Sequence, residues 1–326
     1  MLQSDSERSA TVSQPSYQLR PNKAVDRLTL IDAIRRLAKP HELGNYTYYS
    51  MGGPTLEDFR LIYEFFPEIR MVCIEQNDNI YKRQQFHLPC RSNRLKLHKN
   101  LFASFLSEYE AHDRSGIFWL DYTDLEYSNF DDFMRLLPKA GANSLIKITL
   151  RCNPLDYKEE AKSSAFFQKF AALLPGSLEV LPIRLRDFAE LLQKMVQIAA
   201  QTALPSAMPQ MLLPLSSFYY NDGTGMFTFT GVICRRNDAP AFKKTFKTWQ
   251  FANLDWSEPN EISVPSLSTK ERLHLQRSLP CRQNAGRTLQ RALGYLIGDS
   301  KKETESKLQQ YADFHRYFPY FIKAIP

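Results

Sequence analysis

Glu75 is the first candidate for chemistry, because it directly follows Ile69–Ile74, an apolar run typical of a buried strand. It stands about 20 residues after the pair Gly52 and Gly53, which ends an earlier β-rich run. Glycines at a strand end let a ligand approach the backbone, and an acid at this distance commonly accepts hydrogen bonds from ribose hydroxyls. The spacing therefore indicates a nucleoside-binding site. A solvated charge at a strand end is the alternative.

The turn Tyr48–Pro54 contains neither the GxGxxG nor the GxxxxGK[ST] pattern of phosphate-binding loops. Glu57 and Asp58 follow at the start of the next predicted helix, where carboxylates suit the helix dipole but would repel a pyrophosphate. They would tolerate a sulfonium or ammonium group. The turn therefore favours S-adenosylmethionine over NAD or ATP, and a role in the helix dipole alone is the alternative.

A second acid, Asp121, ends the predicted strand Ile117–Leu120. Ligands of open α/β sheets lie at the carboxyl ends of strands, so Asp121 could act as a general base or orient a substrate amine or hydroxyl. Tyr122 could stack on a base or cover the cofactor. Asp124 is either a second carboxylate or a turn residue, and two acids from one loop make a weak case for Mg²⁺.

Other polar residues near the predicted strand ends leave alternatives open. Asn77 lines the adenine side of the site or caps the next helix, and Asn100 contacts adenine or caps the helix from Leu101. The five cysteines and six histidines show no spacing typical of zinc sites, so we expect no metal. We expect reduced, mostly buried thiols in a cytoplasmic protein, with Cys73 in the core.

Alternating strand and helix patterns position these residues. Runs at 46–51, 69–74, 94–98, 117–120 and 144–150 predict strands, and periodic apolar residues at 56–66, 80–88, 101–109, 130–137 and 161–174 predict helices. A further helix, from Ala24 to Leu37, precedes the first strand and ends before Pro40. Parallel strands need such crossover helices, so the pattern predicts a doubly wound α/β sheet.

The last sheet element is different. Met211–Asn221 and Met226–Arg235 flank Asp222-Gly223-Thr224-Gly225, which is a strong hairpin signal. Five strand–helix units and an antiparallel hairpin predict a Rossmann-like sheet of about seven strands. This order resembles that of class I S-adenosylmethionine-dependent methyltransferases. Beyond it we expect a mostly helical C-terminal appendage, with a linker at 251–264, a capping box at Ser268 and Glu271, and helices at 239–249, 286–297 and 302–314.

Charge and composition divide the chain into three predicted parts. We expect a disordered tail at 1–16, a methyltransferase-like domain at 17–238 and the helical appendage at 239–326. The net charge of +7 is carried by the C-terminal segment Arg235–Pro326, which holds 16 Lys and Arg against 9 Asp and Glu. This excess indicates a nucleic-acid surface or only a solvated face. We expect no membrane span and no secretory signal.

Five strings carry a family resemblance, which covers about residues 17–280. They are Tyr17–Arg27, Tyr49–Pro54 with Leu56–Phe59, Tyr81–Gln84, Trp119–Thr123 and Pro265–Pro280. Together they resemble a bacterial family known as putative O-methyltransferases and, more distantly, the three-Cys-motif partner proteins. The resemblance implies a Rossmann-like fold and an N-terminal segment folded over the site. Arg20, Lys23 and Arg27 would then face the substrate or form a lid, and surface charge at a helix start is the alternative.

Two departures from the class I pattern leave two functions open. No acid precedes the glycines in Tyr48–Pro54, and the fourth strand ends in Asp-Tyr-Thr, not in the Asn-Pro-Pro-Tyr or Asp-Pro-Pro-Tyr of enzymes that methylate base amines. The first hypothesis is a methyltransferase acting on a nucleic acid or a protein, in which alignment of nucleophile and methyl group dominates catalysis. The second is a degenerate, methyltransferase-like module that binds a protein partner or acts as a sensor, for example in bacterial antiphage defence.

The first hypothesis assigns a role to each candidate residue. The catalytic pair would be Asp121 and Tyr122. The residues expected to bind S-adenosylmethionine are Ser50, Met51, Gly52, Gly53, Glu75, Gln76 and Asn100.

Overall fold

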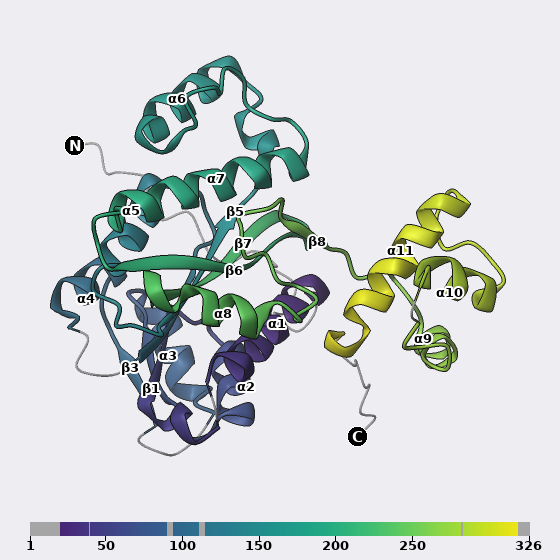
Figure 1. Cartoon of the computed structure of the whole chain (residues 1–326), viewed down its shortest axis with the longest axis horizontal. Coiled ribbons are helices and arrows are strands. Elements are labelled where there is room, and N and C mark those ends of the chain that lie inside the picture. Colours follow the sequence, from purple (N-terminus) through teal and green to yellow (C-terminus); the bar gives the residue numbers. More distant parts are fainter. Residues whose placement is uncertain (1–19, 39, 90–93, 111–114, 282, 319–326) are drawn as a thin grey trace.

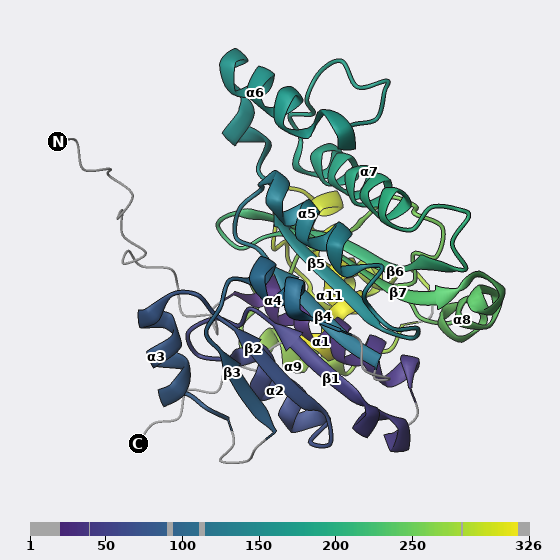
Figure 2. The ribbon, with the colours of Figure 1, turned by 90° about the vertical axis from the view of Figure 1, so that its left-hand side faces the viewer.

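A mixed β-sheet forms the centre of the protein (Figures 1 and 2). The computed structural model describes residues 20–38, 40–89, 94–110, 115–281 and 283–318, and the tail predicted at 1–16 lies outside these residues. Eight strands of the described chain join in the order β3-β2-β1-β4-β5-β7-β6-β8. The predicted α/β class and Rossmann-like strand order are therefore confirmed, with one strand more than expected.

The first five strands are parallel and the next two form the predicted hairpin. The parallel strands are β1 (Tyr46–Ser50), β2 (Arg70–Ile74), β3 (Leu95–His98), β4 (Ser115–Asp121) and β5 (Leu145–Arg151). The hairpin consists of β6 (Gln210–Asn221) and β7 (Gly225–Arg235), and β7 pairs antiparallel with β5. The strand order reverses between β1 and β4, which is where ligands bind in open α/β sheets.

Helices cover both faces of the sheet (Figure 2). One face carries α1 (Pro21–Leu37), α2 (Glu57–Phe65) and α8 (Ala239–Phe246), and the other carries α4 (Phe102–Glu108), α5 (Tyr127–Leu136), α6 (Glu160–Phe170) and α7 (Leu185–Ala203). The helix α3 (Asp78–Phe86) connects β2 to β3. Because both faces are covered, the central strands are buried and nearly continuously apolar, as their sequences predict.

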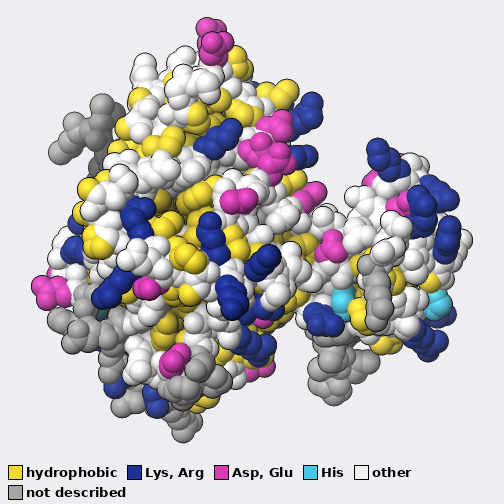
Figure 3. All heavy atoms as spheres, viewed as in Figure 1, with side chains coloured by type: hydrophobic (Ala, Val, Ile, Leu, Met, Phe, Trp, Pro, Cys, Tyr) yellow, Lys and Arg dark blue, Asp and Glu magenta, His cyan; other side chains and the backbone are white. Residues whose placement is uncertain are grey.

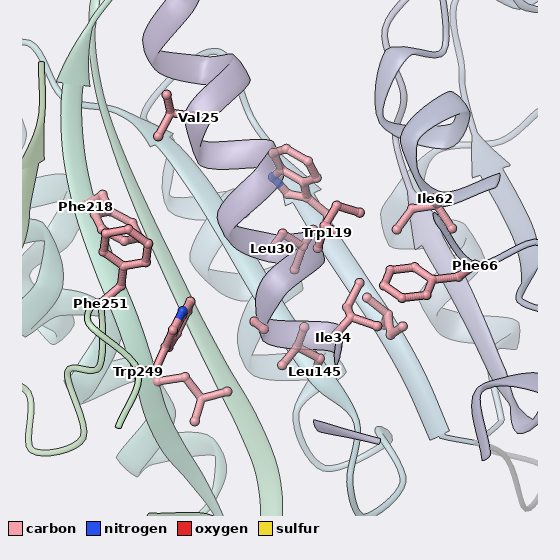
Figure 4. Close-up of a cluster of buried hydrophobic side chains, with 14 of the residues drawn as sticks. Val25, Leu30, Ile34, Ile62, Phe66, Trp119, Leu145, Phe218, Trp249 and Phe251 are labelled. Atoms are coloured by element: carbon pink, nitrogen blue, oxygen red, sulfur yellow. The ribbon is translucent and has the colours of Figure 1, made fainter. Parts of the chain in front are cut away.

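The core beneath α1 contains large aromatic side chains. Figure 4 shows three apolar residues of α1, Val25, Leu30 and Ile34, facing this cluster. Its other labelled members are Ile62, Phe66, Trp119, Leu145, Phe218, Trp249 and Phe251. Burying each such side chain contributes roughly 1.5–3 kcal/mol, so α1 is an integral layer of the fold.

Asp222, in the tight turn between β6 and β7, caps the start of α1. Its carboxylate accepts hydrogen bonds from the backbone N–H groups of Asn22, at 3.3 Å, and Lys23, at 2.9 Å. These are N–H groups that a helix leaves without an intrahelical partner. The hairpin turn therefore fixes the first turn of α1 over the sheet edge.

Two elements differ from the sequence-based expectations. α7 was not predicted, although Phe188, Leu192 and Met195 have helical spacing and are buried. The predicted linker at 251–264 contains an eighth strand, β8 (Asn260–Ile262), which pairs parallel with β6. The segment Asn260–Ile262 is short and contains no apolar run, so the sequence does not predict a strand there. Its extended conformation depends on pairing with the neighbouring strand.

The last three helices, α9 (Thr269–Gln276), α10 (Ala285–Leu293) and α11 (Lys301–Phe314), form a group that projects from the sheet in Figure 1. The Ser268–Glu271 capping box predicted for α9 is confirmed, with hydrogen bonds of 2.7 and 3.2 Å. Stacking of Phe314 on Phe251, with ring centroids 4.9 Å apart, joins this group to the main body. The domain boundary at 238/239 stays a prediction, although β8, beyond it, belongs to the sheet.

Among the described helices, none combines the length and apolar character that a membrane crossing requires.

Candidate active site

Three adjacent strands end together at the point where the strand order reverses. β1 ends at Ser50, β4 at Asp121 and β5 at Arg151. Glu75 follows β2, the next strand outward, at the same edge of the sheet. Two of the predicted acids, Glu75 and Asp121, therefore lie at the edge where a nucleotide-like ligand would bind.

A lysine from α1 contacts the acid at the end of β4. The Lys23 Nζ atom lies 2.8 Å from Oδ1 and 2.6 Å from Oδ2 of Asp121. The Lys23 side chain is 4% exposed and that of Asp121 is 18% exposed. A surface charge at a helix start, the alternative considered for Lys23, is therefore wrong. A charge-assisted contact with both oxygens is among the stronger polar interactions in proteins, and it fixes a cation and an acid side by side.

A second, fully buried ion pair lies beneath the first. Lys147 Nζ is 2.7 Å from Asp26 Oδ1, and the two side chains are 1% and 0% exposed. Burial lowers the pKa of Lys147, and the Asp26 carboxylate opposes this effect. The Trp119 ring lies near both ammonium groups, 5.9 Å from Lys23 Nζ and 5.1 Å from Lys147 Nζ. Two ion pairs thus hold α1 against β4 and β5.

This second pair was not predicted, although the sequence contains its signal. Lys147 stands in the middle of an apolar strand that is buried on both faces. Lysine is almost never fully buried without a partner, so its position already implies a buried acid. Nothing in the sequence identifies that acid as Asp26, which is 121 residues away.

Arg27 and Asp58 belong to another polar group below β1. The Tyr48 hydroxyl donates a 2.7 Å hydrogen bond to Asp58. Burial raises the pKa of Asp58, while the bond from Tyr48 and the charge of Arg27 lower it in part. Asp58 therefore contacts the sheet and does more than complement the helix dipole. Arg27 is 6% exposed, so a surface position is wrong for this residue also.

Gly52 has a structural role in the turn after β1. Its φ of +43° suits glycine, and an added Cβ would lie 2.8 Å from the Phe59 ring and 2.9 Å from Cys73 Sγ. Gln84 Nε2 donates a 3.1 Å hydrogen bond to the Gly52 carbonyl. Close packing against α2 and β2 therefore accounts for this glycine. Ser50 is fully buried at the end of β1, whereas Met51 and Gly53 are partly exposed.

Glu75 lies half-buried in the loop after β2. Its Oε1 atom accepts a 2.6 Å hydrogen bond from the backbone N–H of Asn77. Burial raises the pKa of Glu75, and hydrogen bonds from the backbone of Gln76 and Asn77 lower it in part. The Gln76 side chain is exposed beside it. The fully solvated charge considered as the alternative does not describe this carboxylate.

The two asparagines near this loop make local hydrogen bonds. Asn77 caps α3, because its side chain accepts hydrogen bonds from Asn79 and Ile80 backbone N–H groups. Asn100 Oδ1 accepts a 2.9 Å hydrogen bond from the backbone N–H of Leu101. Asn77 therefore acts as the capping alternative predicts, whereas Asn100 contacts only the residue that precedes α4 and does not cap this helix.

The loop after β4 is fixed by contacts with α5. The Tyr122 hydroxyl donates a 2.9 Å hydrogen bond to Asp132, and burial raises the pKa of Tyr122. Asp124 accepts a 3.0 Å hydrogen bond from Asn129, as a turn residue would. A catalytic role for the Tyr122 hydroxyl would therefore require it to leave Asp132. Within the described ranges, no group of three or more His, Cys, Asp or Glu residues is arranged to hold a metal ion.

A small pocket adjoins the Lys23–Asp121 pair. It has a volume of about 90 Å³ and lies between the start of α1, the β6–β7 turn and the ends of β4 and β5. The lining residues are Arg20, Lys23, Thr123, Arg151, Tyr220, Asp222, Thr224 and Met226. A larger hollow of about 490 Å³, near Leu204, Met211 and Trp256, lies at the opposite edge of the sheet. Its described lining contains no ion pair.

The chain matches a known protein family over nearly its whole length. The family is described as putative O-methyltransferase, and its model matches residues 15–326. This match confirms the methyltransferase family predicted from the sequence. It does not specify a substrate, and it supports neither a bacterial origin nor the similarity to three-Cys-motif partner proteins. No curated protein sequence matches the chain.

Solved structures similar to this chain include three with low sequence identity. Trm1 from Pyrococcus horikoshii, solved with S-adenosyl-L-methionine, has 12% identity and a TM-score of 0.46, over 66% of this chain and 56% of its own. LepI, solved with the same ligand, has 12% identity and a TM-score of 0.34, over 57% and 42%. A DUF574 family protein from Streptomyces avermitilis has 16% identity and a TM-score of 0.40, over 65% and 82%. The chain thus spans about half the length of the first two proteins.

Proposed function

Since this chain belongs to the putative O-methyltransferase family, we propose that it transfers a methyl group from S-adenosylmethionine to an oxygen atom of an acceptor molecule. The site of transfer would be the sheet edge at the ends of β1, β2 and β4. The observation that carries this proposal is the Lys23–Asp121 ion pair, which lies at the end of β4 next to a pocket.

The residues of this edge suit a cationic, ribose-containing cofactor. Glu75 would accept hydrogen bonds from the ribose hydroxyls, as the spacing from Gly52 predicts. The turn Ser50–Gly53 and the side chains of Gln76 and Asn100 would border the cofactor. When bound, S-adenosylmethionine supplies an activated methyl group. Glu57, at the start of α2, favours a positive ligand over a pyrophosphate.

Asp121 and Lys23 would each have a role in the transfer step. Asp121 would accept the proton of the acceptor hydroxyl at a carboxylate oxygen. The Lys23 ammonium would compensate the negative charge that develops on the acceptor oxygen. The 2.6 Å contact between Lys23 Nζ and Asp121 Oδ2 would keep both side chains in place before the acceptor binds. The first turn of α1 would exclude water from them.

The test separates cofactor binding from transfer. Asp121→Asn should bind S-adenosylmethionine within a few-fold of the wild type but lose roughly 100-fold or more in methyl transfer to cell fractions, because general-base catalysis contributes about 10²–10⁴-fold. Asp131→Asn, which changes a half-exposed acid on α5, is the matched control and should leave both quantities unchanged. An Asp121→Asn variant that retains wild-type transfer would contradict the role of Asp121.

A second candidate function is a binding or sensor module without catalysis. Two observations favour it: the turn Tyr48–Pro54 lacks an acid, and both oxygens of Asp121 contact Lys23. If S-adenosylmethionine binds but no cell fraction accepts its methyl group, this function replaces the first.

We also propose nucleic acid as the first substrate class to test, with protein as the second. On the face shown in Figure 3, several Lys and Arg side chains lie along the outer side of the α9–α11 group, and basic surfaces attract phosphate backbones. The cysteines that the structure describes, Cys73, Cys152, Cys234 and Cys281, are free thiols. This state agrees with a cytoplasmic location, which stays a proposal.

A further inference from the structure

The pocket beside the ion pair is lined mainly by hydrogen-bond donors. Its cationic residues are Arg20, Lys23 and Arg151, and its hydroxyl residues are Thr123, Tyr220 and Thr224. A pocket with this lining complements a ligand group rich in acceptor oxygens.

The carboxylate in the lining is already committed to α1. Asp222 accepts hydrogen bonds from the backbone N–H groups of Asn22 and Lys23 and from the Asn22 side chain, at distances of 2.9 to 3.3 Å. Asp222 therefore fixes the start of α1 beside the pocket. It repels an anionic ligand less than a carboxylate without hydrogen-bond donors would. Arg151 is also held in place, by a 2.6 Å contact between its Nε atom and Asp156.

Tyr220 supplies an independent observation that points to a ligand. Its side chain is 1% exposed, yet its hydroxyl has no hydrogen-bond partner among the described residues. Buried hydroxyl groups are nearly always paired, so an unpaired one needs an explanation. Burial raises the pKa of Tyr220, and the Asp26 and Asp121 carboxylates raise it further. At neutral pH it is therefore a donor.

We propose that this pocket binds an anionic group, a carboxylate or a phosphate, of the acceptor molecule, and that the Tyr220 hydroxyl donates a hydrogen bond to it. The volume of about 90 Å³ equals that of roughly three water molecules, which suits one such group and excludes a larger part of the acceptor. Because Lys23 lines the pocket and also contacts Asp121, binding there would hold a neighbouring hydroxyl of the acceptor close to Asp121. The inference rests on the proposed function in treating the ligand as the acceptor.

The test uses the full chain and two simple anions. Inorganic phosphate and benzoate are titrated at constant ionic strength, and binding is followed by ³¹P and ¹H nuclear magnetic resonance. We expect saturable binding of at least one probe, and the two titrations distinguish phosphate from carboxylate. Arg20→Gln should weaken it about tenfold, since one charge-assisted hydrogen bond is lost. Arg70→Gln, at the opposite edge of the sheet, is the matched control and should leave binding unchanged.

Tyr220→Phe provides the sharper readout. It should weaken anion binding about three- to tenfold while leaving the melting temperature of the ligand-free protein unchanged or higher, because the hydroxyl has no protein partner to lose. A lower melting temperature, or the absence of saturable binding by both anions, would overturn the inference. Calorimetry with S-adenosylmethionine on the same samples tests the proposed function separately, because the cofactor can bind whether or not the anions do.

Discussion

Replacing Lys147 with methionine should strongly destabilise the protein. The substitution keeps the length of the side chain but removes the ammonium group that lies 2.7 Å from Asp26. Asp26 is fully buried, so its carboxylate would be left without a compensating charge. Removing one member of a buried ion pair typically costs 3–5 kcal/mol, and a native domain has only about 5–15 kcal/mol in total.

One feature of the pair predicts that the loss of stability can be reversed. Asp26 Oδ2 has no hydrogen-bond partner in the described chain, so the pair is imperfectly satisfied. The double variant Asp26→Leu, Lys147→Met should therefore recover most of the loss, because apolar replacement of a buried ion pair is often neutral or stabilising. Glu159→Gln is the control, since Glu159 forms an exposed pair with Lys162 that is worth about 0–1 kcal/mol.

The assay is urea unfolding followed by circular dichroism, repeated over a range of pH. Burial lowers the pKa of Lys147 from its ordinary value of 10.5, so the unfolded chain binds this proton more readily. The contribution of Lys147 to the free energy of unfolding should thus rise as pH increases toward 10.5, and this rise should vanish in Lys147→Met. A loss below about 1 kcal/mol in the single variant, or no recovery in the double variant, would refute the buried pair as an anchor of α1.

Three further perturbations test the glycine turn, the acid after β2 and the C-terminal helices. Gly52→Ala should cost about 1–3 kcal/mol in urea unfolding, because its Cβ would meet the Phe59 ring at a positive φ; unchanged stability would contradict the packing role. Affinity for S-adenosylmethionine should fall as pH drops through the pKa of Glu75, which burial raises above 4.5. Calorimetry should show no such dependence in Glu75→Gln, and a wild-type pH profile in that variant would exclude Glu75. Ser268→Ala removes one half of a capping box and should cost about 1 kcal/mol, seen as a lower melting temperature, whereas an unaltered melt would show that the cap is dispensable.

The first seven strands of the sheet were predictable because their signals are local. Apolar runs bounded by turn residues predict β1 to β5, and Asp222-Gly223 predicts the hairpin, since glycine accepts the positive φ of the turn. β8 was not predictable in this way. Its three residues are extended because β6 offers them a partner, and that contact joins Phe218 to Asn260, far apart in the sequence.

The candidate site was predictable only in part. Spacing and strand ends identify Glu75 and Asp121, and the structure places both at one edge of the sheet. The partners of these acids were not predictable, because Lys23 meets Asp121 across 98 residues of sequence. Asp222 illustrates the same limit: it has the composition of a turn residue, and only the folded chain shows that it caps α1.

Binding of S-adenosylmethionine to the full chain tests the central claim most directly. Isothermal titration calorimetry should show saturable binding with one ligand per chain, weakened at least about tenfold in Glu75→Ala, since the lost hydrogen bonds involve a charged group. Wild-type protein that gives no binding heat and no displacement of a labelled cofactor would contradict the assignment of this sheet edge to methyl transfer.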